Sequence, residues 1–380
     1  MSRNELAKCK RLVIKVGTRV LVDRRGRPDL DRMRALVEQM AALRAGGYQV
    51  ILVSSGAIGA GIEALSLARR PTALPELQMA AAVGQSKLMA HYDALFGEFG
   101  VAVGQVLLIH SDLKDRRRHL NARNTMMALL RNGIVPVVNE NDVVAVDEIR
   151  FGDNDQLASL VTMLVDADLL LLLSTTNGLR APVPGEGKRT RRIPFLSKID
   201  DEALALAWGK GDQLSTGGMK TKLEAARSVV EVGGAAIIAD GRKSDVIKDI
   251  LSGKDVGTLF GHPGPRILAS KKRWIAFFQR PTGHLIIDEG AERAILRQGK
   301  SLLPIGIRAV EGQFGLGATV NIKNEEGKLI ARGLAEYTSD EIATIKGHRT
   351  AEIPKLLGDR PYDEVIHRDN MVLLQGEEKK

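Results

Sequence analysis

The sequence lacks the hallmarks of several protein classes. It has one cysteine, Cys9, among 380 residues, so it forms no internal disulfide and offers no cysteine-based metal site. No apolar run reaches the ~18 residues that a membrane helix needs, because the longest, 169–173, has the length of a strand. Residues 1–10 are polar and charged, unlike a secretory signal. These absences predict a cytoplasmic protein that does not span a membrane.

Aromatic residues are also scarce, at 4%, which leaves few rings to stack on nucleic-acid bases. The phosphate-binding pattern G-x-x-x-x-G-K-[ST] does not occur, so any use of ATP must rely on another kind of site. The net charge is +9. Such a charge suits nucleic acid, anionic small molecules or an ordinary basic surface, and it decides between none of them.

Residues 11–260 alternate short apolar segments with longer segments of helical spacing. The expected strands are 11–16, 48–53, 101–108, 134–138, 169–173 and 235–239, and the expected helices are 29–45, 74–99, 118–131, 153–165, 219–232 and 244–251. This alternation predicts an α/β fold, a three-layer sandwich with a mainly parallel sheet.

The pattern changes after Gly261. A Pro/Gly stretch leads into the basic run 271–273, and short strand candidates separated by glycine follow at 284–287, 306–310, 318–322, 329–334 and 371–374. We therefore predict a first domain over 1–262, a linker over 263–278 and a small, mostly β domain over 279–380.

Two glycine-containing turns follow the first two expected strands, where open α/β sheets bind ligands. Lys15 ends the first strand, and its ammonium either reaches the surface or meets an anion. The turn 54–61 has glycines in the order G-x-x-G-x-G. A nicotinamide-binding turn has the order G-x-G-x-x-G with an acidic residue ~20 positions later, so that alternative is disfavoured.

Three polar segments complete the pattern. Asn and Asp gather at 139–142 and again at 152–155, which suits turns and helix caps or, if the two meet on one sheet edge, the ammonium and carboxylate of an amino acid. Segment 215–222 places hydroxyls, glycines and two lysines at a helix start, which suits a polyphosphate.

Taken in order, these segments resemble the amino acid kinase family, in particular its members that phosphorylate glutamate. The resemblance spans essentially the whole chain and rests on LVIKVGT (12–18), VSSGAIGAG (53–61), AAVGQSKLM (81–89), LNARNTM (120–126), IVPVVNENDVVA (134–145), GDNDQLASL (152–160) and TGGMKTKL (216–223). VNEND followed by GDND is specific to the glutamate-phosphorylating members, whereas TGGM-x-TK is shared more widely.

The resemblance implies a role for each matching residue. Lys15 and Lys222 would bridge the phosphates, and Asp155 would orient the two lysines and the substrate. The implied glutamate-binding residues are Ser55, Asn139, Asp142 and Asn154. The implied ATP-binding residues are Lys15, Gly17, Ser174, Thr175, Thr216, Gly217, Gly218, Met219, Lys220, Thr221 and Lys222. Mg²⁺ would bridge phosphate oxygens, and no metal site built from protein ligands is predicted.

One position departs from the family pattern. Ser174-Thr175 stands where the family usually has Thr-Asp, so a carboxylate is missing at the expected nucleotide edge. Segment 181–192 is basic and unlike the family's usual tyrosine-containing loop; we expect it to be mobile and nucleotide contact to be altered.

The C-terminal segments 283–291, 301–304 and Gly306 resemble a PUA domain, a small β-barrel known from RNA-modifying enzymes. This resemblance implies RNA contact through Lys271, Lys272, Arg273 and Arg308, or a role in stability, assembly or regulation. The scarcity of aromatics favours the second alternative. The family resemblance also implies a homodimer or homotetramer and feedback inhibition by proline at or beside the glutamate site.

Two other functions stay open at this stage. A related kinase of the same fold would act on acetylglutamate, aspartate, carbamate or a nucleotide, which the paired Asn/Asp clusters disfavour. An RNA-binding protein with a vestigial kinase domain is disfavoured because Lys15, Asp155 and Lys222 are all present.

Overall fold

The computed structural model describes residues 2–23, 26–145, 154–183, 185, 189–208, 218–261, 281–358 and 363–374. The chain divides into two compact units, Met1–Ile267 and Leu268–Lys380. The linker proposed over 263–278 lies outside the described residues. Each unit has its own hydrophobic core and is described by itself.

The first unit is built on an eight-stranded sheet. Its order is β3 (Val103–Leu108), β4 (Val135–Glu140), β2 (Gln49–Ser54), β1 (Arg11–Val16), β5 (Leu169–Ser174), β9 (Ala235–Asp240), β10 (Thr258–Gly261) and β8 (Phe195–Leu196). Neighbouring strands are parallel except β9 and β10. The prediction of a mainly parallel sheet is confirmed. Because parallel strands end at the same edge, the segments after β1, β2, β4 and β5 share one side of the molecule.

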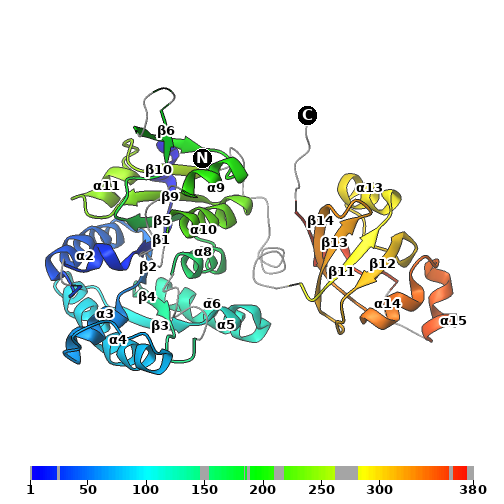
Figure 1. Cartoon of the computed structure of the whole chain (residues 1–380), viewed down its shortest axis with the longest axis horizontal. Coiled ribbons are helices and arrows are strands. Elements are labelled where there is room, and N and C mark those ends of the chain that lie inside the picture. The colour runs from blue at the N-terminus through cyan, green and yellow to red at the C-terminus, as the bar shows by residue number, and fades with distance from the viewer. Residues whose placement is uncertain are drawn as a thin grey trace. The chain divides into compact units, whose positions relative to one another are not determined.

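Helices cover both faces of this sheet (Figure 1). One layer contains α2 (Leu30–Ala45), α3 (Ala57–Ala64), α4 (Leu74–Gly97) and α11 (Val246–Leu251), and the other contains α5 (His110–Lys114), α6 (Arg116–Arg131), α8 (Asn154–Leu164) and α10 (Met219–Glu231). Short elements complete the unit: η1 (Arg3–Lys8), α1 (Thr18–Leu21), α9 (Asp201–Ala205) and η2 (Leu206–Trp208). Leu169 to Leu173 have no exposed surface, as expected for a central strand covered on both faces.

Helix starts follow the chemistry of capping. The Asp115 side chain accepts a hydrogen bond from the Arg118 amide, so α6 begins at Arg116, two residues before the predicted start. Asp153, the first residue of the expected helix 153–165, lies outside the described residues. The basic segment predicted as a loop over 181–192 contains the paired strands β6 (Arg180–Pro182) and β7 (Thr190–Arg192), while residues 184 and 186–188 are outside the described part.

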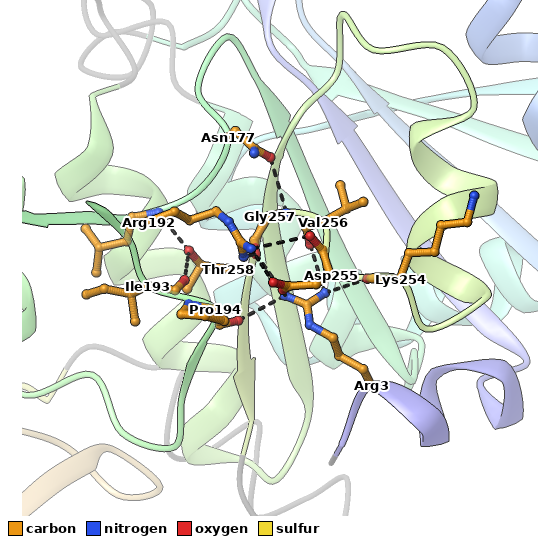
Figure 2. A network of polar contacts seen from close by, with 11 residues as sticks. Arg3, Asn177, Arg192, Ile193, Pro194, Lys254, Asp255, Val256, Gly257 and Thr258 are labelled. Carbon is orange, nitrogen blue, oxygen red and sulfur yellow. Dashed lines mark hydrogen bonds and ion pairs between the residues drawn. The ribbon is translucent and has the colours of Figure 1, made fainter. Parts of the chain in front are cut away.

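A network of hydrogen bonds and ion pairs around Arg3 connects η1 to the segments beside β8 and β10 (Figure 2). The Arg3 guanidinium donates to four backbone carbonyls at 2.8–3.1 Å, those of Pro194, Lys254, Val256 and Gly257. Asp255 pairs with Arg3 at 3.0 Å and with Arg192 at 2.5 Å. The Asn177 Oδ1 accepts from the Gly257 amide at 3.2 Å. The segment after β5 is thereby tied to β10 and to η1.

The second unit has a five-stranded sheet in the order β12 (Ile307–Glu311), β11 (Gly283–Ile287), β13 (Thr319–Asn324), β14 (Leu329–Leu334) and β15 (Met371–Leu373). Only β11 and β13 run parallel. Its helices are α13 (Glu289–Gln298), α14 (Ser339–Ile345) and α15 (Ile353–Leu357), with short turns η4 (Pro304–Gly306), η5 (Thr350–Glu352) and η6 (Arg368–Asn370). The predicted small, mostly β module is confirmed, with three helices that the strand pattern did not show.

None of the helices within the described ranges combines the length and the apolar composition that a bilayer crossing requires.

Candidate active site

Lys15 lies one residue before the end of β1, with its side chain 4% exposed. Its neighbours Ile14 and Val16 belong to the main core cluster, so by strand alternation Lys15 faces the opposite side of the sheet. There its Nζ lies 2.5 Å from Oδ1 of Asp155, at the start of α8. Lys15 is therefore a buried, ion-paired lysine and does not reach the surface.

Lys222, in the first turn of α10, reaches the same carboxylate. Its Nζ lies 2.9 Å from Oδ2 of Asp155, and the Asp155 side chain has no exposed surface. Burial alone raises the pKa of Asp155, but the ammonium groups of Lys15 and Lys222 outweigh it and hold the pKa well below its usual range. We call Lys15, Asp155 and Lys222 the charged triad. With two cations and one anion, it carries a buried net charge of +1 that suits an anionic ligand.

The start of α10 adds groups that suit an anion. The Thr221 hydroxyl lies 3.1 Å from Oδ2 of Asp155 and 2.9 Å from the Gly218 carbonyl. Gly218 is the N-cap and offers no side-chain cap, which leaves the first backbone amides of this 13-residue helix to other partners. Met219 is half-buried in the same turn, whereas Lys220 is exposed and lies 3.8 Å from Glu224. Thr216 and Gly217 lie outside the described residues.

The ends of β1 and β5 are joined by backbone contacts. The Gly17 amide donates to the Leu173 carbonyl at 3.0 Å, and the Gly241 amide donates to the Ser174 carbonyl at 2.8 Å. The Arg242 guanidinium donates to the Thr175 carbonyl at 2.7 Å. Gly17, Ser174 and Thr175 therefore lie on one edge of the sheet, where β1, which carries Lys15, and its neighbour β5 end.

Sequence reasoning missed the carboxylate of Asp240 at this edge. Asp240 ends β9 directly beside Ser174, and it accepts hydrogen bonds from the Arg242 side chain at 2.8 and 2.9 Å. These hydrogen bonds lower the pKa of Asp240. A carboxylate therefore lies on β9, the neighbour of β5, close to the position where Thr175 replaces the aspartate that is usual in the family. The available signal was an aspartate at a strand end, followed by glycine and arginine.

A set of neutral polar side chains adjoins the triad, because Asn154 precedes Asp155. The Nδ2 of Asn154 lies 2.9 Å from the Ser54 carbonyl, 3.1 Å from the Ser55 Oγ and 2.7 Å from the Asn139 Oδ1. Gly56 follows Ser55 with φ +112°, a left-handed conformation that glycine adopts without strain. The two Asn/Asp clusters, from β4 and α8, therefore meet through Asn139 and Asn154.

The chain of amides extends one step further. The Nδ2 of Asn139 donates to the Oε1 of Gln85 on α4 at 2.8 Å. We call Ser55, Asn154, Asn139 and Gln85 the amide chain. The segment 81–89 contributes to the family resemblance, but the sequence predicts no role for Gln85, because a glutamine in a helix carries no distinctive pattern.

Asp142 follows β4 and is half-buried. Burial raises the pKa of its carboxyl to about 6, against the opposing effect of Arg70. Residues 146–153, which follow shortly after Asp142, lie outside the described part of the molecule.

The basic residues considered for RNA contact are separated from this site in the sequence. Lys271, Lys272 and Arg273 lie outside the described residues. Arg308, on β12, is exposed and its guanidinium lies 3.0 Å from Oδ2 of Asp288. Part of its charge is thus already balanced within the second unit.

Comparison with known proteins agrees with this geometry. Residues 10–240 match the amino acid kinase family, and residues 283–357 match the PUA domain. The chain belongs to the amino acid kinase family and carries a PUA domain. It is similar over nearly its whole length to proteins named glutamate 5-kinase. That of Moorella thermoacetica is 48% identical over 98% of both chains. Those of Syntrophotalea carbinolica and Trichlorobacter lovleyi are 45% and 47% identical over 98% of this chain and 100% and 99% of theirs.

Proposed function

We propose that this protein transfers the γ-phosphoryl group of ATP to the side-chain carboxylate of L-glutamate, giving L-glutamyl 5-phosphate and ADP, as in the first step of proline biosynthesis. The observation that carries this proposal is the charged triad, buried beside the amide chain, in a sequence 45–48% identical to glutamate 5-kinases. A carboxylate oxygen bonds to the γ-phosphorus while the bond to the β,γ-bridging oxygen breaks and ADP leaves.

The charged triad suits this transfer because phosphoryl transfer depends mainly on positioning and charge neutralisation. We assign Lys15 and Lys222 to the charge on the moving phosphoryl group. Asp155 then serves as a positioning residue, since both of its oxygens hold the two ammonium groups at 2.5 and 2.9 Å. The backbone amides at the start of α10 and the edge formed by Gly17, Ser174 and Thr175 would hold the nucleotide.

Mg²⁺ would accompany the nucleotide. Magnesium in kinases takes much of its coordination from phosphate oxygens and water, with one or two carboxylates. Both Asp155 oxygens face lysines, and the described residues contain no cluster of three His, Cys, Asp or Glu that could hold a metal. Mg²⁺ would neutralise charge on the phosphates, and the protein's part is to hold the two lysines around the reacting group.

The glutamate would lie along the amide chain. Its reacting carboxylate belongs beside the triad, and the ammonium pairs with Asp142 in its ionised form. Ser55, Asn139 and Asn154 supply hydroxyl and amide groups between the two. Acetylglutamate lacks the ammonium that pairs with Asp142. Aspartate is one methylene shorter than glutamate, so its side-chain carboxylate would not reach the triad while its ammonium pairs with Asp142.

We extend the proposal to the surroundings of the enzyme. Cys9 is the single cysteine of the sequence and is buried, and a thiol that forms no disulfide suits the reducing cytoplasm. Inhibition by proline at the glutamate site and assembly into a homodimer or homotetramer follow from the family resemblance. Millimolar proline, added with glutamate near its KM, should lower the rate; an unchanged rate would remove proline from the proposal. RNA contact through the PUA domain is not proposed as the main role.

The activity is tested by ADP release from purified protein with ATP, Mg²⁺ and glutamate, aspartate or acetylglutamate in turn. Glutamate should support turnover, and Lys222→Met should lower kcat by about 10²–10³-fold, the loss typical of one group that stabilises transition-state charge. Lys248→Met, an exposed lysine on α11, is the control and should keep the wild-type kcat. Turnover with aspartate in place of glutamate would refute the substrate assignment.

A further inference from the structure

Gln85 lies on α4, in the layer that covers the sheet beside β2 and β4. Two glycines bring α4 unusually close to α3, the helix that follows the Ser55 turn. A Cβ at Gly84 would lie 1.7 Å from the Ala57 carbonyl oxygen, and one at Gly61 would lie 1.8 Å from that of Ala80. Since no side chain fits at either place, the backbone next to Gln85 is held against the start of α3.

The hydrogen bonds of the amide chain fix which end of each amide faces which neighbour. Asn154 approaches Ser54 and Ser55 through its Nδ2, so it donates there, and it also donates to the Oδ1 of Asn139. Asn139 then has its Nδ2 left, which donates to the Oε1 of Gln85. Gln85 therefore accepts a hydrogen bond through its Oε1, and its Nε2 is left to donate to another partner.

That donor is buried and has no hydrogen-bond partner among the described residues. Buried amide groups in proteins are nearly always paired, so an unpaired one beside a ligand site indicates a bond to the ligand. The group that satisfies an amide N–H is an acceptor, and a carboxylate is the strongest acceptor that glutamate offers.

The order of strands distinguishes between the two carboxylates of glutamate. Lys15 is on β1, Ser55 follows β2 and Asn139 is on β4, and these strands are neighbours in the order β1, β2, β4. Gln85 follows Asn139 in the amide chain, so it lies at the end of the site away from the lysines. The reacting carboxylate belongs at the lysines, which leaves the α-carboxylate for Gln85.

We propose that the Nε2 of Gln85 donates a hydrogen bond to the α-carboxylate of bound glutamate and thereby helps to select an α-amino acid as the acceptor. This inference rests on the function proposed above. It makes Gln85 a specificity-determining residue at the far end of the substrate from the transferred phosphoryl group.

The test is Gln85→Glu, which keeps an oxygen for Asn139 and replaces only the donor. We expect the KM for glutamate to rise about 10–100-fold, the range for loss of a hydrogen bond to a charged group, with the KM for ATP unchanged and kcat within about threefold. Gln85→Met, which removes the acceptor as well, should raise the same KM. Ser86→Ala, the exposed neighbour on α4, is the control and should behave as wild type.

A second probe separates this role from a structural one. 4-Aminobutyrate keeps the amine and the reacting carboxylate but lacks the α-carboxylate, so its inhibition constant against glutamate should be the same in wild type and Gln85→Glu. An unchanged KM for glutamate, or an equal weakening of glutamate, 4-aminobutyrate and ATP, would overturn the proposal. Turnover of glutamate by the wild type tests the proposed function. The ratio of the variant's KM for glutamate to that of the wild type tests the role of Gln85.

Discussion

The charged triad and the amide chain are neighbours on one sheet edge, joined by the consecutive residues Asn154 and Asp155. In the triad, a fully buried carboxylate is balanced by two ammonium groups and one positive charge remains. In the amide chain, neutral groups satisfy one another, and the Nε2 of Gln85 remains as a buried donor with no partner among the described residues. The triad is suited to charge that develops during the reaction, and the amide chain to the shape and polarity of the substrate before the reaction.

This contrast predicts different kinetic consequences. Changes in the triad should act mainly on kcat, because its charge acts on the transferred group. Changes in the amide chain should act mainly on the KM for glutamate, because its contacts are the same in the ground state and the transition state. The following substitutions test that division.

The largest effect is expected for Asp155→Asn, which leaves two buried ammonium groups without their counter-ion. Breaking a buried ion pair costs about 3–5 kcal/mol of unfolding free energy. Since the lysines also lose their positions, kcat should fall by about 10²-fold or more. Urea unfolding and steady-state kinetics at pH 7 measure both quantities.

The pH dependence gives an independent check on Asp155. The folded state depresses the pKa of its carboxyl, so its stabilisation is present above the unfolded value of about 4 and is lost as the pH falls toward the folded value. The stability difference between wild type and Asp155→Asn should therefore shrink below pH 4. The surface pair of half-buried Asp249 and exposed Lys254 is the control: Asp249→Asn should cost much less than Asp155→Asn. A similar cost at both positions would contradict a buried triad.

An intermediate effect is expected for Asn154→Asp, which turns the donor of the amide chain into an acceptor. Three oxygens that now receive the Asn154 amide would face a carboxylate. We expect a loss of about 1–3 kcal/mol in unfolding free energy and a rise of about 10–100-fold in the KM for glutamate. Asn132→Asp, at the exposed end of α6, is the control and should leave both the unfolding free energy and the KM for glutamate close to the wild-type values. A fall in kcat without a change in KM would break the proposed division.

The smallest effect on catalysis is expected for protonation of Asp142, which in the wild type occurs at mildly acidic pH. Its pKa of about 6 means that the carboxyl loses its charge, and its attraction for the substrate ammonium, below that pH. In the free enzyme, kcat/KM for glutamate should fall up to tenfold per pH unit between pH 6 and 5. Asp142→Asn should have a low kcat/KM that is flat over this range. A wild-type profile without this inflection would exclude Asp142 as the ammonium partner.

Stability should respond to Asp142 in the opposite sense. A raised folded pKa favours folding while the carboxyl is protonated, and that contribution is lost as the pH rises through about 6. Asp142→Asn should therefore be more stable than wild type at pH 8, by about 2 kcal/mol, and equal to it below pH 4. Such a gain would show that the carboxylate is retained for function at the expense of stability.

Much of the first unit was predictable from the sequence. The strands around Lys15 and Leu169–Leu173 were found from apolar runs, and α2 and α10 from helical spacing, because local periodicity and caps specify such elements. The sequence did not indicate β8 and β10 or the hairpin of β6 and β7. These strands are short, and they are stabilised by the long-range hydrogen bonds of Arg3 and Arg192 (Figure 2).

For the site, the sequence by itself determined the residue types, their order and the chemistry they suit: two lysines, two Asn/Asp clusters and glycine turns after strands. Only the tertiary structure decided that Lys15 and Lys222, 207 positions apart, share one carboxylate. It also decided that Gln85 ends the amide chain with a donor that no described residue pairs. The reason is physical. Local sequence sets backbone conformation, whereas burial and the pairing of charges and amides arise when distant strands end at one edge.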